Sequence, residues 1–282
     1  MIAPAGFAQA LAAAFRQDDP SALGALLDDL PADSPPLVPM AVLAKAHRSL
    51  DLLLSRGFSA NETRVDRLAG LHLVNDAKMV RTLVAAGGDV NLASAGGTPL
   101  HLAAANATPP VIKALLDAGA DPSATRDDSV TCVTPLEVAC ELGRTAAVKA
   151  LLARPPGHAT CFFLTAAFVT RKGKKELAVL DLLLAAFGAD MEPPAGYDFL
   201  LHIASKAGCL DGVERLIERG AAIDRPDREG RTAAFLAMAG LFPRPEHVEV
   251  FRRLAAAGAN LDQRSGNVTP RDLAQRHGVA LP

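Results

Sequence analysis

Two short runs of apolar residues follow one another over residues 98–121, each at the spacing of a helix face. The first run starts at Thr98-Pro99, where the hydroxyl can accept a hydrogen bond from a first-turn amide and the proline loses no helical bond. Pro109-Pro110 separates the runs, and Gly119 follows the second run as a residue suited to ending a helix. The pattern predicts two short helices joined by a turn.

This helix pair has too little apolar surface to fold alone, so copies of it are expected to stack. Leu115-Leu116 follows Thr98 at the same distance at which Leu151-Leu152 follows Thr134. Leu216-Ile217 follows Phe199 at that distance too. The repetition predicts an array of similar units along the chain.

The segment Thr98-Pro99-Leu100-His101-Leu102-Ala103 resembles the Thr-Pro-Leu-His-x-Ala signature of the ankyrin repeat. The resemblance implies an all-α ankyrin-repeat solenoid of about eight stacked helix pairs with hairpin fingers and polar end caps. It also implies a single domain over 1–282. This would comprise an N-terminal capping helix pair at 1–35, repeats at 36–268 and a C-terminal cap at 269–282.

Two units depart from the pattern. In the third unit, Gly87 follows Leu71 sooner than Gly119 follows Leu100, so its inter-helix turn is expected to be about three residues shorter. In the unit at 160–190, aromatic rings replace the signature, and a basic run over 171–175 is expected to be an insertion between the two helices.

Composition narrows the class of function. The formal net charge of −2 argues against general nucleic-acid binding, which selects a basic face. No apolar run is long enough to cross a membrane, and the N-terminus lacks the basic start of a signal peptide. The cysteines form no Cys-x-x-Cys pair, so we expect free thiols in a cytoplasmic protein. The excess of Arg over Lys indicates a GC-rich, bacterial gene.

The sequence gives no sign of catalysis. The resemblance implies that His101 and His202 are structural, with rings that bond backbone groups of the adjoining turn. No other histidine has a partner at metal-ligand spacing, and the sequence has no His-Glu-x-x-His, phosphate-binding loop or Gly-x-Ser-x-Gly motif. We therefore predict no catalytic, cofactor-binding or metal-binding residues, and no enzyme activity.

Ankyrin proteins bind partners with their finger tips and the exposed side of their first helices, so the resemblance implies a concave protein-binding surface. The finger candidates are Arg126, Asp127, Asp128, Tyr197, Asp198, Arg225, Asp227, Arg228, Arg231, Gln263 and Arg264. The first-helix candidates are Asn106, Glu141, Phe168 and Lys206. Tyr197, with Arg225 or Arg228, is the predicted anchor, because Tyr and Arg are enriched at binding hot spots.

Several functions fit this surface. The first is a generic protein-protein interaction module, monomeric when free. The second is a dedicated inhibitor, such as a bacterial immunity protein that covers the active site of a toxin. The third is the regulatory subunit of an enzyme. The basic run at 171–175 is either a solvated loop or a second docking site for an acidic partner.

Overall fold

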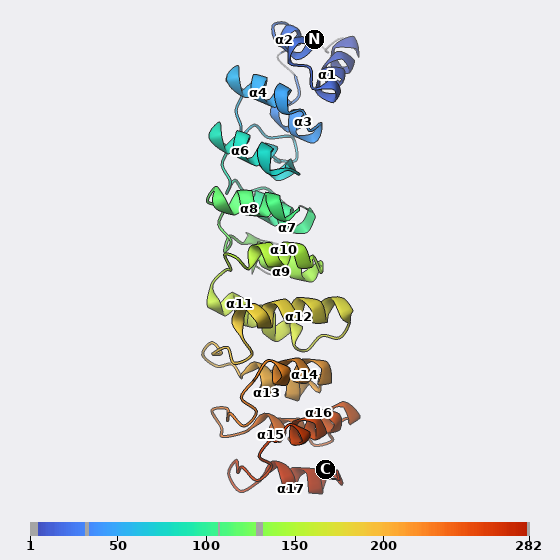
Figure 1. The fold of residues 1–282 in the computed structure, drawn as a ribbon, viewed down its shortest axis with the longest axis vertical. Helices are drawn as coiled ribbons and strands as arrows, with labels where there is room; N and C mark the ends of the chain where they lie inside the picture. The colour runs from blue at the N-terminus through green and yellow to red at the C-terminus, as the bar shows by residue number, and fades with distance from the viewer. Residues whose placement is uncertain (1–4, 32–33, 107, 128–131, 281–282) are drawn as a thin grey trace. The chain divides into compact units, whose positions relative to one another are not determined.

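The computed structural model describes residues 5–31, 34–106, 108–127 and 132–280. Within them the chain folds into short helix pairs (Figure 1). Contacts divide the chain into two compact units, Met1–Pro155 and Pro156–Pro282. Each unit has its own stack of helices, and the grouping of both into one domain stays a prediction.

The first unit contains five helix pairs. Their first helices are α1 (Ala5–Gln17), α3 (Leu37–Leu43), α5 (Gly70–Leu73), α7 (Pro99–Asn106) and α9 (Pro135–Glu141). Their second helices are α2 (Pro20–Leu27), α4 (His47–Ser55), α6 (Ala77–Ala85), α8 (Pro109–Asp117) and α10 (Thr145–Leu151). First helices pack on first helices and second helices on second helices, as α7 does on α9 and α8 on α10.

The second unit contains three helix pairs and a single last helix. Its first helices are α11 (His158–Phe168), α13 (Leu200–Ala207), α15 (Ala233–Met238) and α17 (Pro270–Arg276). Its second helices are α12 (Lys174–Phe187), α14 (Leu210–Glu218) and α16 (Pro245–Ala256). The described residues therefore hold the predicted number of helix pairs, and the all-α solenoid is confirmed.

The connections between helix pairs form the predicted hairpin fingers. In the longest finger of the first unit, β1 (Arg126–Asp127) pairs antiparallel with β2 (Cys132–Val133). Three other fingers close through single bridges, which join Thr63 to Ala69, Ser94 to Gly97 and Ser265 to Val268. These short pairings supply the strand content of the described residues.

The core is a thin layer of aliphatic side chains between successive second helices. Leu83, Leu115 and Leu151 occupy it in the first unit, and Leu183 and Leu216 occupy it in the second, all almost fully buried. Burial of one such side chain contributes about 1.5–3 kcal/mol relative to exposure. Because this layer lies between neighbouring helix pairs within each unit, each pair gains stability from the pairs it touches.

In the repeats of α5, α7 and α13, a histidine at the signature position joins the repeat to the next finger. The Nε2 atom of His72 lies 3.0 Å from the Leu92 carbonyl, and that of His101 lies 3.0 Å from the Val133 carbonyl. His202 Nε2 lies 3.2 Å from the carbonyl of Arg231. The predicted structural role of His101 and His202 is confirmed.

Asparagine or aspartate side chains at the base of the fingers form a second set of links. Asn61 donates to the Gly87 carbonyl at 3.0 Å and accepts from the Asp89 amide at 2.7 Å. In the second unit, Asp190 accepts from the amide of Ala222 at 3.1 Å. These bonds satisfy backbone groups exposed where the next helix pair ends.

Thr98 and His101 meet at the start of α7. The Thr98 hydroxyl lies 2.9 Å from Nδ1 of His101, and the Thr98 amide donates to the same nitrogen at 3.1 Å. The histidine ring thus satisfies the Thr98 amide, and the bond from a first-turn amide to the Thr98 hydroxyl stays a prediction. Thr134 forms the predicted type of cap, since its hydroxyl accepts from the Glu137 amide and the Glu137 carboxylate accepts from the Thr134 amide.

The third helix pair, α5 and α6, is shortened in its first helix and not in the turn between its helices. α5 has four residues, whereas α7 has eight. The connection from α5 to α6 spans residues 74–76 and is no shorter than the one from α7 to α8. Asp76 explains why α6 begins where it does. Its carboxylate accepts from the Lys78 and Met79 amides as the cap of α6, and this cap requires extended backbone at Asp76.

The insertion in the unit at 160–190 is also placed differently from the prediction. The connection between the helices spans 169–173, and Lys174 and Lys175 belong to the first turn of α12. α11 and α12 have 11 and 14 residues, so longer helices take up much of the extra chain. Gly173 makes the break possible, because its φ of 121° is a conformation that other residues rarely adopt.

We predict that His101→Ala destabilises the protein by about 1–3 kcal/mol, because it leaves the partly buried Val133 carbonyl without its donor. Urea denaturation followed by circular dichroism measures the change. His158→Ala, at an exposed position, is the control and should change stability little. Equal losses in the two variants would contradict a linking role for His101.

We predict that stability falls as the pH drops below about 6.5, the pKa of an unperturbed histidine. Burial lowers the pKa of His72 and His202, more than hydrogen bonds and nearby carboxylates raise it. The unfolded chain then binds more protons over the range between the unfolded and folded pKa values, so acid favours unfolding. Thermal melts across this range should show a smaller loss in a His72→Gln, His202→Gln variant than in the wild type.

Candidate functional site

An exposed pair of aromatic rings lies between the first two helix pairs of the second unit. Tyr197, in the finger before α13, is 52% exposed, and Phe163, on α11, is 41% exposed. Their ring centroids are 4.8 Å apart and meet edge to face. Phe163 in turn contacts the buried ring of Phe162 at 5.9 Å. The pair is therefore held in place and still presents a large apolar surface to solvent.

Phe163 is a functional candidate that the sequence analysis did not include. It stands at the position that a histidine occupies in α7 and α13, and side chains there reach toward the next finger. That signal was available from the sequence, because a ring at this position must meet the finger that holds Tyr197.

Next to the ring pair, an ion pair brings together two of the predicted residues. Asp198 follows Tyr197 in the finger, and its carboxylate accepts from the Lys206 ammonium at 3.0 Å. Lys206 lies on α13 with an exposed side chain. The finger and the first helix thus meet at this ion pair.

A hollow continues this surface between α13 and α15. Lys206, Arg231 and Arg244 supply its cationic side chains, and Leu236 and Phe242 supply apolar wall. Phe242 is 92% exposed. The sequence analysis did not include Leu236, Phe242 or Arg244. The sequence signal that could have indicated this hollow was the apolar pair Leu241-Phe242 beside Pro243-Arg244-Pro245.

Asp227 organises the finger after α14 and does not face outward. Its side chain is 3% exposed and accepts from the amides of Glu229 and Arg231 and from the Arg231 guanidinium. Burial raises the pKa of Asp227, but these hydrogen bonds and the Arg231 charge lower it further, so the net pKa is lowered. Asp227 is therefore a poor candidate for direct contact with a partner.

The two predicted arginine anchors differ in availability. The Arg225 guanidinium lies 3.9 Å from the centre of the Phe199 ring and pairs with Glu192. Arg228 is exposed and has no ion pair with a described carboxylate. Arg228 is thus the arginine that this finger leaves available.

Phe168 is a wrong prediction as a surface residue. Its ring is 1% exposed, and the Arg171 guanidinium lies 4.5 Å from the ring centre. The connection after α11 folds over the helix end and covers the ring.

The other predicted residues do not join the cluster around Tyr197. Asn106 and Glu141 are exposed at the ends of α7 and α9, and Arg126 is half-buried in β1, all in the first unit. The Asp127 side chain and all of Asp128 lie outside the described residues. In the last finger, Gln263 is half-buried and Arg264 is exposed.

The described residues contain no group of three histidine, cysteine or carboxylate side chains that could hold a metal ion. None of the helices in the described part of the chain is long and apolar enough to span a membrane.

Comparison with known proteins finds two family models that match this sequence and a solved structure that matches this fold. A model of three ankyrin-repeat copies matches residues 38–160, and a second ankyrin-repeat model matches residues 201–244. The crystal structure of the human ASB11 ankyrin repeat domain is similar, with a TM-score of 0.51 and 18% identity, over 79% of this chain and 98% of that one. No curated protein has a significantly similar sequence.

We predict that Asp227→Asn lowers stability by about 1–3 kcal/mol at neutral pH, because the buried Arg231 bonds lose their charged acceptor. Because the folded pKa of Asp227 is lowered, its contribution is present above the unfolded value of about 3.9 and is lost as the pH falls through the folded value. Urea denaturation should show the two proteins converging in acid. A difference that does not depend on pH would contradict this account.

Proposed function

We propose, as the chain belongs to the ankyrin-repeat family, that it is a protein-binding module without catalytic activity. Ankyrin repeats are generally protein-protein interaction modules. The partner docks on the surface formed by Phe163, Tyr197, Asp198, Lys206 and Phe242, which we call the finger face. The observation that carries the proposal is the exposed Phe163–Tyr197 ring pair beside a hollow with cationic side chains.

The finger face has the composition of a protein-binding hot spot. Rigid aromatic side chains offer large contact area with little loss of rotamer freedom, and a surrounding polar rim excludes water from them. Here the rings are fixed by contact with each other and with Phe162. A partner that covers them gains burial without having to order them first.

The charges around the rings favour a protein over a nucleic acid or a membrane. Asp198 and Glu229 lie among Lys206, Arg231 and Arg244. A nucleic acid or an anionic membrane selects a uniformly basic surface, whereas charges of both signs select a partner with a matching pattern.

The proposal also covers the oligomeric state and the cellular compartment of the protein. We propose a protein that is monomeric when free and cytoplasmic. Cys140, Cys161 and Cys209 are buried, and the cysteines of the sequence form no Cys-x-x-Cys pair, which fits a reducing compartment. The bacterial source remains an expectation from the Arg-rich composition.

Two more specific roles fit the same surface. A dedicated inhibitor, such as an immunity protein, would cover the active site of its partner, and a regulatory subunit would change the activity of an enzyme it stays bound to. Activity of the purified partner, measured with and without this protein, separates them. Complete loss indicates an inhibitor, a graded change indicates a regulator, and no change indicates a scaffold.

A photo-crosslinking experiment tests the finger face. A photoreactive phenylalanine replaces Tyr197 in one protein and Arg219, on the second-helix side, in a control. We expect specific crosslinks from position 197 alone, identified by mass spectrometry. Crosslinks from position 219 alone would contradict the proposal.

With the captured partner purified, we predict that Tyr197→Ala combined with Arg228→Ala weakens binding at least about tenfold, because loss of a central anchor costs about 2 kcal/mol or more. Neutralising Arg171, Lys172, Lys174 and Lys175 together should change affinity much less. Calorimetry measures both, and circular dichroism checks that the helices are kept. The reverse order of effects would move the binding site to the edge that carries the basic run.

A further inference from the structure

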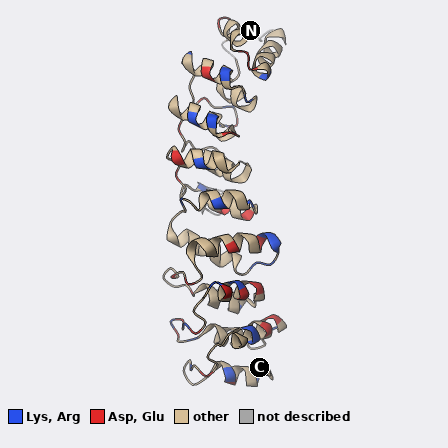
Figure 2. Cartoon of the chain, viewed as in Figure 1, with Lys and Arg blue, Asp and Glu red and all other residues tan. Residues whose placement is uncertain are grey.

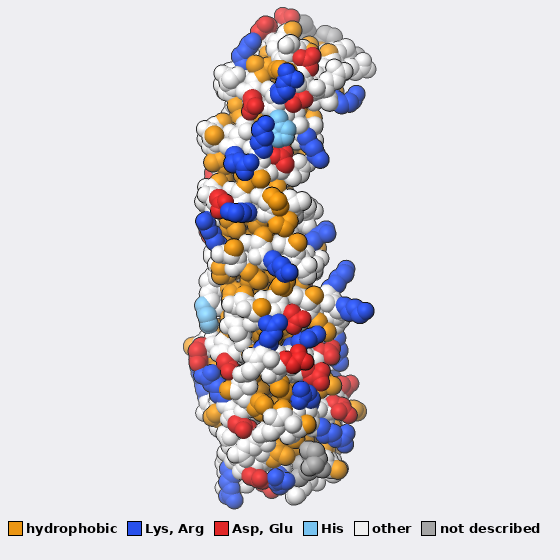
Figure 3. Space-filling view, viewed as in Figure 1, with side chains coloured by type: hydrophobic (Ala, Val, Ile, Leu, Met, Phe, Trp, Pro, Cys, Tyr) orange, Lys and Arg blue, Asp and Glu red, His pale blue; other side chains and the backbone are white. Residues whose placement is uncertain are grey.

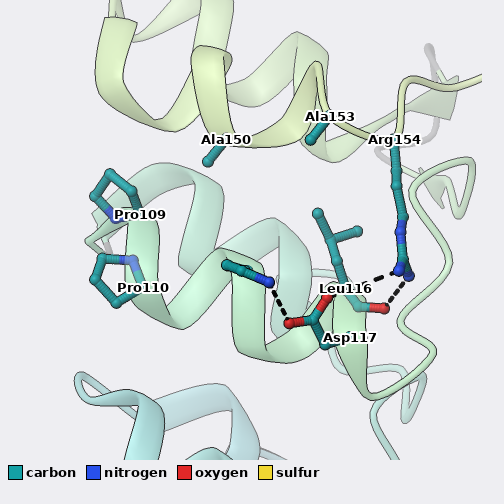
Figure 4. A pocket seen from close by; sticks show the side chains of 8 residues that line it. Pro109, Pro110, Leu116, Asp117, Ala150, Ala153 and Arg154 are labelled. Atoms are coloured by element: carbon teal, nitrogen blue, oxygen red, sulfur yellow. Dashed lines mark hydrogen bonds and ion pairs between the residues drawn. The ribbon is translucent and has the colours of Figure 1, made fainter.

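The first unit has a separate groove between the second helices α8 and α10. Its volume is about 590 Å³. Pro109 and Pro110 form one end, Ala150 and Ala153 form the wall on the α10 side, and Leu116 lies at its base (Figure 4). The groove exists because the alanines of α10 are too small to fill the space beside α8.

Apolar side chains extend the groove across α8. A second hollow lies between α6 and α8 and is lined by Val80, Val84, Ala114 and Ala118. In the space-filling view, apolar atoms gather over α8 and α10 with few charged side chains between them (Figure 3). The second-helix side of the first unit therefore offers an apolar strip open to solvent.

Cationic side chains border this strip almost without carboxylates. α6 carries Lys78 and Arg81, α8 carries Lys113, α10 carries Lys149, and Arg154 follows α10 (Figure 2).

Asp117 is the one carboxylate in these three helices. It is already bound, since its carboxylate accepts from Lys113 at 2.6 Å and lies 3.7 Å from the Arg154 guanidinium. Among the described residues, no carboxylate pairs with Lys78, Arg81 or Lys149.

The second helices of the other unit show that this charge pattern is specific to the first. α12, α14 and α16 carry seven carboxylates and five cationic side chains, several of them joined in ion pairs such as Arg215–Glu218 and Arg253–Glu214. The second helices of that unit therefore carry anionic and cationic side chains in similar numbers. The unpaired cations beside an open apolar groove are a local feature of α6, α8 and α10.

We infer that this groove is a second docking site, and that its occupant is an acidic amphipathic segment of a protein partner. Apolar side chains of the segment lie in the groove against Pro110, Leu116 and Ala150. Its carboxylates meet Arg81 and Lys149 on either side. The site is built from other residues than the finger face, so it does not rest on the function proposed above.

The alternative occupants fit less well. DNA or an anionic membrane would bind the cationic side chains. However, neither a phosphate backbone nor a flat lipid surface would fill an apolar groove walled by alanines. An amphipathic helix lays its apolar face into such a groove and places its charged side chains along both rims.

A designed peptide provides the probe. It is a fluorescein-labelled helix of about 20 residues, long enough to be partly helical alone, with Leu at i, i+3, i+4 and i+7 and Glu on the remaining face. One matched control peptide has Lys in place of every Glu, and another has Ser in place of every Leu. Fluorescence anisotropy with the full chain is expected to show saturable binding of the first peptide and not of the two controls.

Variants of the chain locate the binding. Arg81→Glu with Lys149→Glu should weaken binding at least about tenfold, because two attractions become repulsions. Ala150→Leu should weaken it about fivefold or more by filling the groove, and it leaves every charge in place. Lys174→Glu with Lys175→Glu on α12 is the matched charge control, and Tyr197→Ala with Arg228→Ala is the finger-face control. Both controls should bind as the wild type does.

The outcomes decide the proposal even where one variant is unstable, because the charge and the volume variants act independently and thermal melts check both. Equal affinity for the acidic and the basic peptide would overturn it, as would unchanged binding by both groove variants. Stronger binding of a DNA duplex or of phosphatidylserine vesicles than of the acidic peptide, lost in the Arg81→Glu, Lys149→Glu variant, would replace the protein segment by those ligands and overturn it too.

Discussion

The bond from a histidine ring to a carbonyl of the following finger is the interaction on which each repeat stack depends. A single helix pair here buries too little apolar surface to be stable, so its neighbours must hold it in register. Leucine contacts alone are non-directional and allow sliding. His72 and His101 supply direction, because each ring bonds at two fixed points, one at its own helix start and one in the next finger. His202 bonds to the next finger through Nε2.

The candidate binding surface lies where this link changes its chemistry. Glu137 occupies the position in α9 and turns back to cap its own helix. Phe163 occupies it in α11 and reaches forward to the next finger, as a histidine would, but meets the ring of Tyr197. The structural link thereby becomes an exposed aromatic pair. One substitution both keeps the connection between neighbouring repeats and creates a surface that a partner can cover.

The two sides of a repeat can evolve separately because the core uses only the inward positions of each helix. Outward positions of first helices and fingers form the finger face in the second unit. Outward positions of second helices form the alanine-walled groove with its cationic rims in the first unit. A repeat protein with so thin a core can therefore serve two partners without a change in its packing.

The sequence by itself determined the local elements. Proline at helix starts, glycine at helix ends and paired leucines at a fixed spacing act within a few residues, so helix pairs, fingers and the family resemblance could be predicted. Only the tertiary structure decided which side chains are available. Phe163 and Phe168 lie on one helix and look alike in sequence, but a loop covers the second and leaves the first exposed. Asp227 turns inward to its own finger, whereas Asp198 pairs across to Lys206. The exposure of a side chain and its ion pairs depend on residues from other parts of the chain, and a local sequence pattern does not determine where those residues lie.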